Sequence, residues 1–509
     1  MPGLTPDVLP GTAALLVSGG DARIVLDPVS GLSVYGCRPC PDPDLVALGS
    51  STASVISETG MAAAAALRHT LLVQLQQMPA AEVYALHAEQ LRVALLAQCG
   101  LTYEVGTDAD MDVVLAASGT DLHLLAALWL RPQCTVLVAD LETGSGVPAA
   151  LQGWHFNRRS AGGCAVVPGA RLDDDGVRGV LVSLAVRDQD GGLIDRRAVD
   201  AACVASVERA VGAGQRVLLV LTDVSKTGLI APSIATALAL KHRWPAQLDV
   251  LVDACQFRLA PEALQAYLAH GCLVALTGSK FLAGPTFCGA LLVPPGVATR
   301  YRERPLAPSL AAYSNAADWP ASWAARRSLP HRANFGLLLR WQAALAELSA
   351  LRAIPVPSIA AFLQRFADAL QTRLALDPCF EALPVAPLDR AALDCRPGWD
   401  GEQTIFPFLV RRQAAGQTVA LSRLDTASLY QQLRAPAVDA NGTTRRFQLG
   451  QPVPCASRAG VQLSALRLCV SAPMIVDACS GRGVDAVIAD AMAALDRIAV
   501  LVDELVATA

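Results

Sequence analysis

The stretch LDVLVDACQFRLAPEALQAYLAHGCLVALTGSK (248–280) decides the fold of this 509-residue chain. Two short runs rich in Val and Leu, 248–255 and 272–279, enclose a run at 261–270 that predicts a helix. Strands that are apolar on both faces and alternate with helices are typical of a parallel sheet buried between two helical layers. The stretch therefore predicts one strand–helix–strand unit of an α/β domain.

The same alternation continues on both sides of this unit. Apolar runs predict strands and the segments between them predict helices: strands at 111–118, 134–140, 164–170, 179–188, 216–225 and 288–294, and helices at 121–130, 195–213 and 232–243. This order indicates a mostly parallel, doubly wound α/β sheet. We expect a large α/β domain (111–345), a smaller C-terminal α+β domain (346–509) and an N-terminal helical segment (1–110) that packs on the small domain and the active site.

The composition narrows the class of protein. An apolar fraction of 53% with 17% charged residues favours a well-buried folded protein over disorder. A net charge of −4 without long runs of one sign makes nucleic acid and membranes poor partners. We expect no membrane-spanning helix and no signal peptide.

The cysteines point to the compartment. The 14 cysteines are scattered, many of them in apolar runs, which predicts reduced thiols in a cytoplasmic protein. The lone Cys37–Cys40 pair is weak support for a metal centre, so we expect no metal site.

Polar residues gather directly after five of the predicted strands. Open α/β sheets bind ligands at the carboxyl ends of their strands, so these groups predict a site at one edge of the sheet. The five clusters are 118–120, 142–144, 225–227, 253–256 and 277–280.

Lys280 stands in a run that is otherwise apolar or small. Only three of the 41 basic residues are lysines, namely Lys226, Lys241 and Lys280. An arginine stays protonated, whereas a desolvated lysine loses its proton readily and can form a Schiff base with a carbonyl group. The surroundings of Lys280 therefore matter for a carbonyl cofactor.

A phosphate-bearing pyridine aldehyde needs an amine, an anion at the ring nitrogen, donors for its phosphate and a group near the ring. Lys280 is the candidate amine, and Asp253 at the end of an apolar strand is the candidate anion. A helix N-terminus that follows a strand binds phosphate well. The other predicted cofactor contacts are Gly119, Thr120, Gln256, Thr277 and Ser279.

On these residues the chain resembles the fold type I pyridoxal-phosphate (PLP) enzymes, and within them the class V aminotransferase and cysteine desulfurase family. The shared features are an Asp-x-x-Gln pair, a lysine 27 residues after the aspartate, and a following Gly-Pro before a Gly-rich strand, here Gly284, Pro285 and Gly289. The resemblance implies a seven-stranded-type sheet, PLP as cofactor, and a homodimer with its sites at the subunit interface.

The resemblance also implies roles outside the central motif. Arg467 would bind the α-carboxylate of the substrate, and the loop 49–57, with Ser51 and Thr52, would close over it. Thr143 takes the place of the histidine that usually stacks on the cofactor ring. Three further positions are possible contacts: Lys226, where many members have an asparagine, and Arg332 near Asn334, where the neighbouring subunit usually supplies a phosphate donor.

We therefore expect a PLP-dependent enzyme that acts on a small amino acid through a Lys280 Schiff base and deprotonation at Cα, of the aminotransferase or β-lyase type. Cys455, 12 residues before Arg467, leaves open a cysteine desulfurase or selenocysteine lyase. A third alternative is a catalytically inactive binding protein with the same fold. Lys226 and Cys455 can each also be interpreted as an ordinary loop residue.

Overall fold

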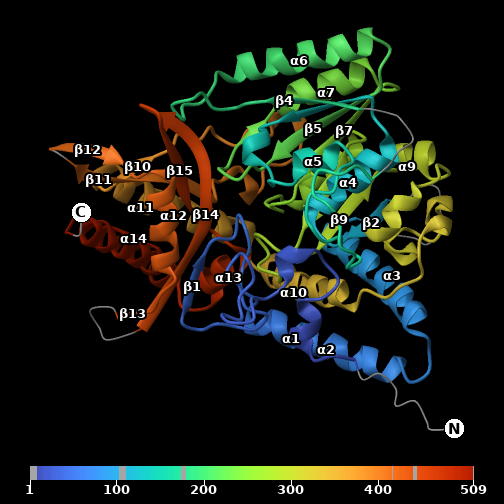
Figure 1. Ribbon diagram of the computed structural model, residues 1–509, viewed down its shortest axis with the longest axis horizontal. Coiled ribbons are helices and arrows are strands. Elements are labelled where there is room, and N and C mark those ends of the chain that lie inside the picture. Colours follow the sequence, from blue (N-terminus) through green and yellow to red (C-terminus); the bar gives the residue numbers. More distant parts are fainter. Residues whose placement is uncertain (1–8, 102–110, 173–178, 415, 439–443, 508–509) are drawn as a thin grey trace.

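The computed structural model describes residues 9–101, 111–172, 179–414, 416–438 and 444–507. Figure 1 shows two β-sheets side by side, each with its own helices, and the N-terminal helices below them. The expected boundary between residues 110 and 111 borders a segment that lies outside the described residues.

The large sheet confirms the predicted α/β architecture. The order of its strands is β2 (Asp112–Ala116), β9 (Gly289–Val293), β8 (Leu273–Thr277), β7 (Leu248–Ala254), β5 (Val217–Asp223), β3 (Cys134–Val138) and β4 (Val180–Leu184), and β6 (Ile230–Ala231) pairs with β5. The strands from β8 to β4 run parallel, whereas β9 is antiparallel to both β8 and β2.

Helices cover both faces of this sheet, as its apolar strands require. Leu219 and Leu221 of β5 belong to one hydrophobic cluster, and Leu218 and Val220 belong to another. The first face packs on α6 (Arg196–Gly212), α7 (Ile234–Arg243) and α8 (Pro261–Ala269), and the second on α4 (Gly119–Leu130), α5 (Val147–Leu151) and α9 (Pro295–Tyr301). Since alternate side chains of a strand point to opposite faces, both halves of the alternation must be apolar.

One predicted strand is wrong. Residues 164–170 form a largely exposed loop in which Ala165 makes a single isolated bridge to Arg159. Pro168 lacks a backbone N–H for a sheet ladder, and Gly163 and Gly169 adopt positive φ angles of 90° and 81°. The run is apolar in composition, but its glycines and proline favour turns over a strand.

The second sheet belongs mainly to the C-terminal part, as the α+β prediction expected. Its strands are β1 (Leu45–Leu48), β14 (Thr444–Arg458), β15 (Val461–Cys469), β11 (Ile405–Ala414), β10 (Phe380–Ala382), β12 (Gln417–Ala420) and β13 (Ala437–Val438). Four helices accompany them, α11 (Val356–Leu376), α12 (Arg423–Leu433), α13 (Ala472–Ser480) and α14 (Val484–Ala507). The edge strand β1 comes from the N-terminal segment and runs parallel to β14.

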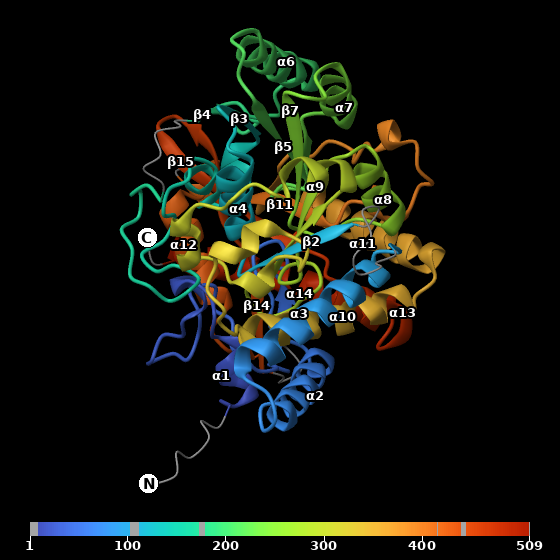
Figure 2. The same cartoon turned by 90° about the vertical axis from the view of Figure 1, so that its right-hand side faces the viewer.

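The N-terminal helices pack on a long helix that follows the large sheet. α2 (Glu58–Gln74) and α3 (Ala80–Gln98) both contact α10 (Phe335–Arg352), as does the short α1 (Thr12–Leu16). Figures 1 and 2 both place α1 and α2 at the opposite end of the molecule from α6 and α7.

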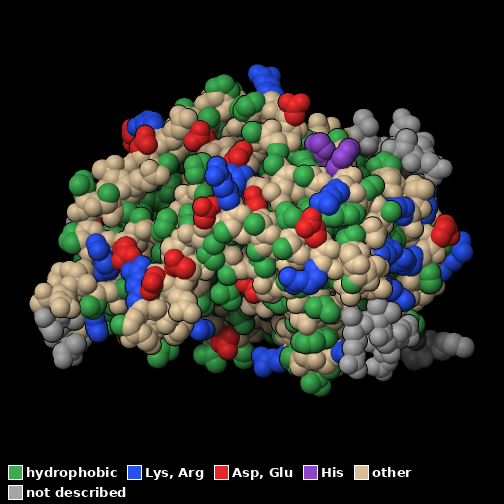
Figure 3. Space-filling view, turned by 90° about the horizontal axis from the view of Figure 1, so that it is seen from above, with side chains coloured by type: hydrophobic (Ala, Val, Ile, Leu, Met, Phe, Trp, Pro, Cys, Tyr) green, Lys and Arg blue, Asp and Glu red, His purple; other side chains and the backbone are tan. Residues whose placement is uncertain are grey.

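Charged side chains of both signs are mixed on one face of the molecule. Figure 3 shows basic and acidic groups interspersed on the face seen from above, without a continuous patch of either sign. In the described ranges, no single helix is long and apolar enough to cross a membrane. The helices α10 and α11, with a bend of 97° between them, together have the length and apolar composition of a membrane span, and this rests on length and composition only.

Candidate active site

A pocket at the carboxyl edge of the large sheet collects most of the predicted residues. Its walls come from the ends of β2, β7 and β8, from the second sheet and from the N-terminal segment. The predicted residues that line it are Ser51, Thr52, Gly119, Thr120, Lys226, Asp253, Thr277, Ser279, Lys280 and Arg467.

The buried pair Asp253 and His123 forms one wall. His123 Nε2 lies 3.3 Å from Asp253 Oδ2, and the other carboxylate oxygen accepts a hydrogen bond of 3.2 Å from the backbone N–H of Cys255. Burial by itself would raise the pKa of Asp253, but His123, Lys280 and the Cys255 N–H outweigh it and lower that pKa. The carboxylate is therefore ionised in this pocket.

The same contact favours the charged form of the histidine. Burial disfavours the imidazolium, yet Asp253 and the Gly119 carbonyl raise the pKa of His123 above its usual value. Its Nδ1 lies 2.7 Å from the Gly119 oxygen, which makes Nδ1 the hydrogen-bond donor. Sequence reasoning missed His123, although a lone histidine three residues after Thr120, in an otherwise apolar helix, was a usable signal.

Lys280 follows β8 in a tight turn. The N–H of Gly284 donates to the Gly278 carbonyl at 2.9 Å, and a Cβ at 278 would lie 2.4 Å from the Ala344 Cβ atom. Glycine is therefore required for this turn to pack against α10. Among the described residues, the Lys280 amine has no hydrogen bond or ion pair, and it is close enough to Asp253 to lower the pKa of that carboxyl.

The N-terminus of α4 and an arginine from the N-terminal segment meet in another part of the pocket wall. Arg23 donates to Thr120 Oγ1 at 3.3 Å and to Ser118 Oγ at 3.2 Å, while Asp21 holds its guanidinium at 2.5 Å. The guanidinium also lies 4.5 Å from the ring centroid of Phe287. Arg23 carries no local motif, so the sequence did not single it out.

An acidic residue in the first turn of α4 lies beside these donors. Asp121 contacts Ser118 Oγ at 2.5 Å. Burial and the nearby Asp21 raise the pKa of Asp121 to about 7. This carboxyl is therefore only partly charged near neutral pH, and repels an anion less than a full charge would.

Arg467 on β15 lies in the pocket wall beside the loop 49–57. Its guanidinium donates to Thr52 Oγ1 at 2.9 Å, to the Gln451 carbonyl at 2.5 Å and to the Lys226 carbonyl at 3.3 Å. All three acceptors are neutral, and burial lowers the pKa of this arginine. No carboxylate pairs with Arg467 in the part of the chain that the structure describes.

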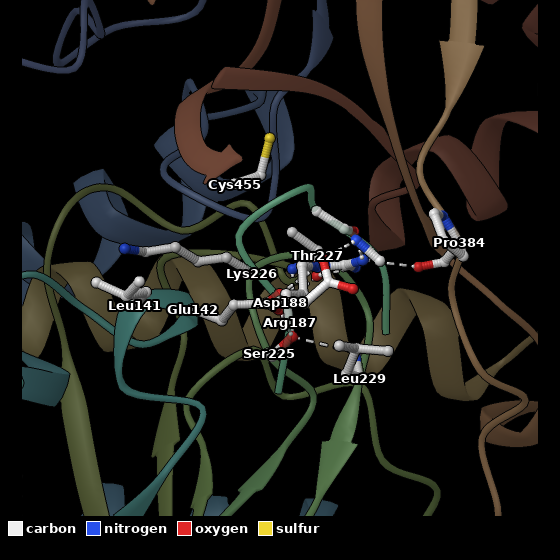
Figure 4. Close-up of polar contacts among 12 residues, drawn as sticks. Leu141, Glu142, Arg187, Asp188, Ser225, Lys226, Thr227, Leu229, Pro384 and Cys455 are labelled. Atoms are coloured by element: carbon white, nitrogen blue, oxygen red, sulfur yellow. Dashed lines mark hydrogen bonds and ion pairs between the residues drawn. The ribbon is translucent and has the colours of Figure 1, made fainter. Parts of the chain in front are cut away.

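Lys226, between β5 and β6, adds a second amine to the pocket. Its backbone N–H donates to the Glu142 carbonyl at 2.9 Å. Burial, Arg467 and Lys280 together lower the pKa of its side chain to about 7. Figure 4 shows this side chain pointing away from the cluster formed by Glu142, Arg187 and Thr227.

Two predicted residues lie beside the pocket rather than in its wall. Thr143 is buried and donates to the Asp140 carbonyl at 2.8 Å, and Gly144 and Ser145 line the pocket at that turn instead. Gln256 donates to the Ser51 carbonyl at 3.1 Å and so ties the loop 49–57 to the end of β7.

Arg332, Asn334 and Cys455 are not brought to this pocket of their own chain. Arg332 is exposed, and Asn334 caps α10 and donates to the Gly19 carbonyl at 3.0 Å. Cys455 lies on β14, where burial raises the pKa of its thiol to about 11. Figure 4 shows its sulfur pointing away from Arg187 and Lys226.

The pocket also holds a possible set of metal ligands. Donor atoms of His123, Asp253 and Cys255 lie within 4.8 Å of one another. Burial and Asp253 raise the pKa of the Cys255 thiol well above its usual value. Since thiolate is the form that binds metals, this protonated thiol is a poor ligand.

Solved structures share the fold. The NifS-like protein from Rickettsia africae matches at 9% identity and a TM-score of 0.50, over 89% of this chain and 99% of its own. The 4-hydroxyphenylacetaldehyde synthase of Rhodiola rosea matches at 14% identity and a TM-score of 0.50, over 97% of this chain and 90% of its own. No protein-family model matches the sequence, and no curated protein sequence matches it.

These likenesses extend over nearly the whole chain and concern its fold. The chain has the fold type I architecture that the motif around Lys280 predicted.

Proposed function

We propose that this protein is a PLP-dependent enzyme that acts on a small amino acid by deprotonation at Cα. The observation that carries the proposal is the placement of the unpartnered Lys280 amine in one pocket with the ionised carboxylate of Asp253. Both stand at the carboxyl edge of a sheet whose fold agrees with this use.

The residues present fit the aldehyde, the ring nitrogen and the phosphate of the cofactor. PLP, when bound, supplies an aldehyde for a lysine amine and a ring that accepts electrons. Lys280 offers the amine, and Asp253 holds a proton at the ring nitrogen, helped by His123. Arg23 and the Thr120 hydroxyl, which accepts from Arg23, offer donors for the phosphate.

The chain supplies the remaining steps from its own side chains. Arg467 orients the substrate through its α-carboxylate, since a guanidinium binds a carboxylate through two N–H groups. Lys280, once free, takes the proton from Cα. The loop 49–57 shields this end of the pocket through Ser51 and Thr52. Deprotonation at Cα serves both transamination and β-elimination.

The position of Cys455 gives no support to desulfuration or selenocysteine cleavage. A nucleophilic cysteine needs a thiolate near the substrate, whereas this thiol has a raised pKa and lies outside the pocket wall. We also propose that the protein is a cytoplasmic homodimer. All 14 cysteines are free, which agrees with a reducing compartment.

Covalent labelling tests the proposal directly. The purified protein should absorb visible light from bound PLP, and borohydride reduction followed by peptide mass spectrometry should place a pyridoxyl group on Lys280. Lys280→Ala should lose both signals, whereas Lys241→Ala, in the last turn of α7, should keep them.

A folded wild-type protein that takes up no PLP would overturn the proposed enzymatic function. It would favour the alternative of an inactive binding protein with the same fold. A screen of amino acids for spectral change and for release of pyruvate, alanine or sulfide would then separate the reaction types, and light scattering would test the homodimer.

A further inference from the structure

The charges in the pocket are unbalanced at its substrate end. Lys226, Lys280 and Arg467 all contribute to its wall, whereas Asp253 is the one acidic side chain among the described residues that line it. Asp253 already faces His123 at 3.3 Å. This end of the pocket therefore holds more positive than negative charge before any ligand binds.

Glu142, the other carboxylate whose charge acts on Lys226, is fully engaged. Glu142 accepts from Arg187 Nε at 2.7 Å and from Ser225 Oγ at 2.5 Å, and it also accepts from Thr227 Oγ1. Figure 4 shows these partners on one side of Glu142, with the Lys226 side chain directed elsewhere. Glu142 thus pairs with Arg187 and makes no direct ion pair with the Lys226 amine.

Lys226 and Arg467 lie on the same part of the wall. Arg467 donates to the carbonyl of residue 226 at 3.3 Å, and the charge of Arg467 lowers the pKa of the Lys226 amine. In the described part of the chain, the Lys226 amine has no hydrogen bond or ion pair. A ligand held by Arg467 consequently extends next to a second, unpaired amine.

A partly buried cation without a partner is costly, and an anion from the ligand reduces that cost. One α-carboxylate matches Arg467 and leaves Lys226 unmatched. We propose, resting on the function proposed above, that the substrate is an amino acid with a second anionic group, a carboxylate or an equivalent acid, and that Lys226 binds this group.

The titration of Lys226 supports the assignment. Arg467 on β15 and Lys280 after β8 disfavour its charged form, while Glu142 and Asp253 favour it, and with burial the pKa comes to about 7. A bound anion raises that pKa, so binding takes up a proton. The affinity for a dianionic ligand should therefore fall as the pH rises above about 7, relative to a monoanionic one.

Unreactive acids test the inference on the PLP-loaded protein. Succinate and glutarate carry two carboxylates, and propionate and butyrate are their counterparts with one. Binding is measured by calorimetry and by the shift of the cofactor absorption. Wild type should bind the dicarboxylates about tenfold more tightly, as expected for one charge-assisted hydrogen bond.

Variants test whether the preference for two carboxylates depends on Lys226. Lys226→Gln should abolish the preference for two carboxylates and lower the affinity for butyrate far less than that for succinate, whereas Lys241→Gln should behave as wild type. A second readout needs no variant: the ratio of succinate to butyrate affinity in wild type should fall between pH 6 and pH 8.5. Comparing the two acids cancels the titration of groups, such as His123, that act on both.

The outcomes separate this inference from the proposed function. If Lys280 carries the pyridoxyl label but both classes of acid bind equally at every pH, the proposed role of Lys226 is wrong. The proposed PLP-dependent function is then unaffected. Retention of the dicarboxylate preference in Lys226→Gln would also overturn that role. A wild-type protein that binds no PLP would overturn the function and the inference together.

Discussion

His123 Nε2 lies 3.3 Å from Asp253 Oδ2, although 130 residues separate the two in the chain. Both side chains are buried, and each raises the stability of the other's charged form. His123 belongs to α4, whose N-terminus lies in the pocket wall. The same helix therefore supplies hydrogen-bond donors for an anion and stabilises the charge of Asp253. This relationship makes the first prediction.

Asp253→Asn should lower the pKa of His123. The carboxylate is the main cause that raises this pKa against burial, so burial should prevail in the variant. An NMR titration of the imidazole C–H signals measures the change, and the spectrum of His123→Gln assigns the signal. An unchanged pKa would mean that the pair does not interact.

The same variant should show a pH-dependent loss of stability. A raised histidine pKa contributes stability that is present below the usual pKa of 6.5 and is lost as the pH rises through the folded value. The lowered pKa of Asp253 contributes above its usual 3.8 and is lost in acid. The difference in the free energy of unfolding between wild type and Asp253→Asn should thus be larger at pH 6 than at pH 9, as urea unfolding would reveal.

Gly119→Ala should disturb the pocket. A Cβ at this position would lie 2.8 Å from Cys255 Sγ and 3.0 Å from Thr277 Cγ2, both in the pocket wall. We expect a loss of about 1–3 kcal/mol in the free energy of unfolding and weaker retention of PLP during dialysis.

Gly212→Ala is the matched control for this substitution. Gly212 ends α6, and nothing lies within 4 Å of the place that an alanine methyl group would take there. Alanine at this position should be neutral or stabilising by about 0.5–1 kcal/mol, since it favours the helix. Equal losses at both positions would contradict the role of close packing at Gly119.

Arg340→Met should loosen the N-terminal segment that carries Arg23. Buried Arg340 on α10 donates to the carbonyls of Leu16, Ser18 and Gly19, and also to that of Phe287 in the pocket wall. Removing it leaves several buried acceptors unpaired, at a cost of about 3 kcal/mol or more.

Thermal unfolding and limited proteolysis near the N-terminus would measure this effect. Arg365→Met, on the exposed face of α11, is the control and should stay within about 0.5 kcal/mol of wild type. A proteolysis pattern unchanged by Arg340→Met would contradict the proposal that Arg340 holds the N-terminal segment in place.

Cys455→Ala should leave both bound PLP and turnover close to wild type. The thiol is largely protonated because burial raises its pKa to about 11, and it lies outside the pocket wall. Sulfide and selenide release assays, together with the absorption spectrum, would check this. Loss of release with retained PLP would restore the desulfurase alternative.

Local patterns accounted for the fold and for the central motif. The strands of the large sheet are apolar on both faces, so their positions could be read from the composition of short runs, and Asp253 and Lys280 stood out at strand ends. The exception at 164–170 arose because the two glycines and Pro168 dictate turns whatever the apolar content of the run.

Other members of the site could not be predicted in this way. Arg23 and Tyr35 reach the pocket from a segment without a recognisable motif, and Gln451 reaches it from a long strand of the second sheet. Each is an ordinary polar residue in its local context. Their roles arise from packing between parts of the chain that are about one hundred residues or more apart.

The sequence by itself determined the alternating α/β architecture and the lysine and aspartate at its edge, because hydrophobic periodicity and strand ends are local properties. Only the tertiary structure decided that His123 stabilises the charge of Asp253 and that Arg23 faces the α4 N-terminus. It also decided that Glu142 forms its ion pair with Arg187 and not with Lys226. Charge in a buried pocket depends on which groups lie within a few ångströms, and that is a property of the packed chain.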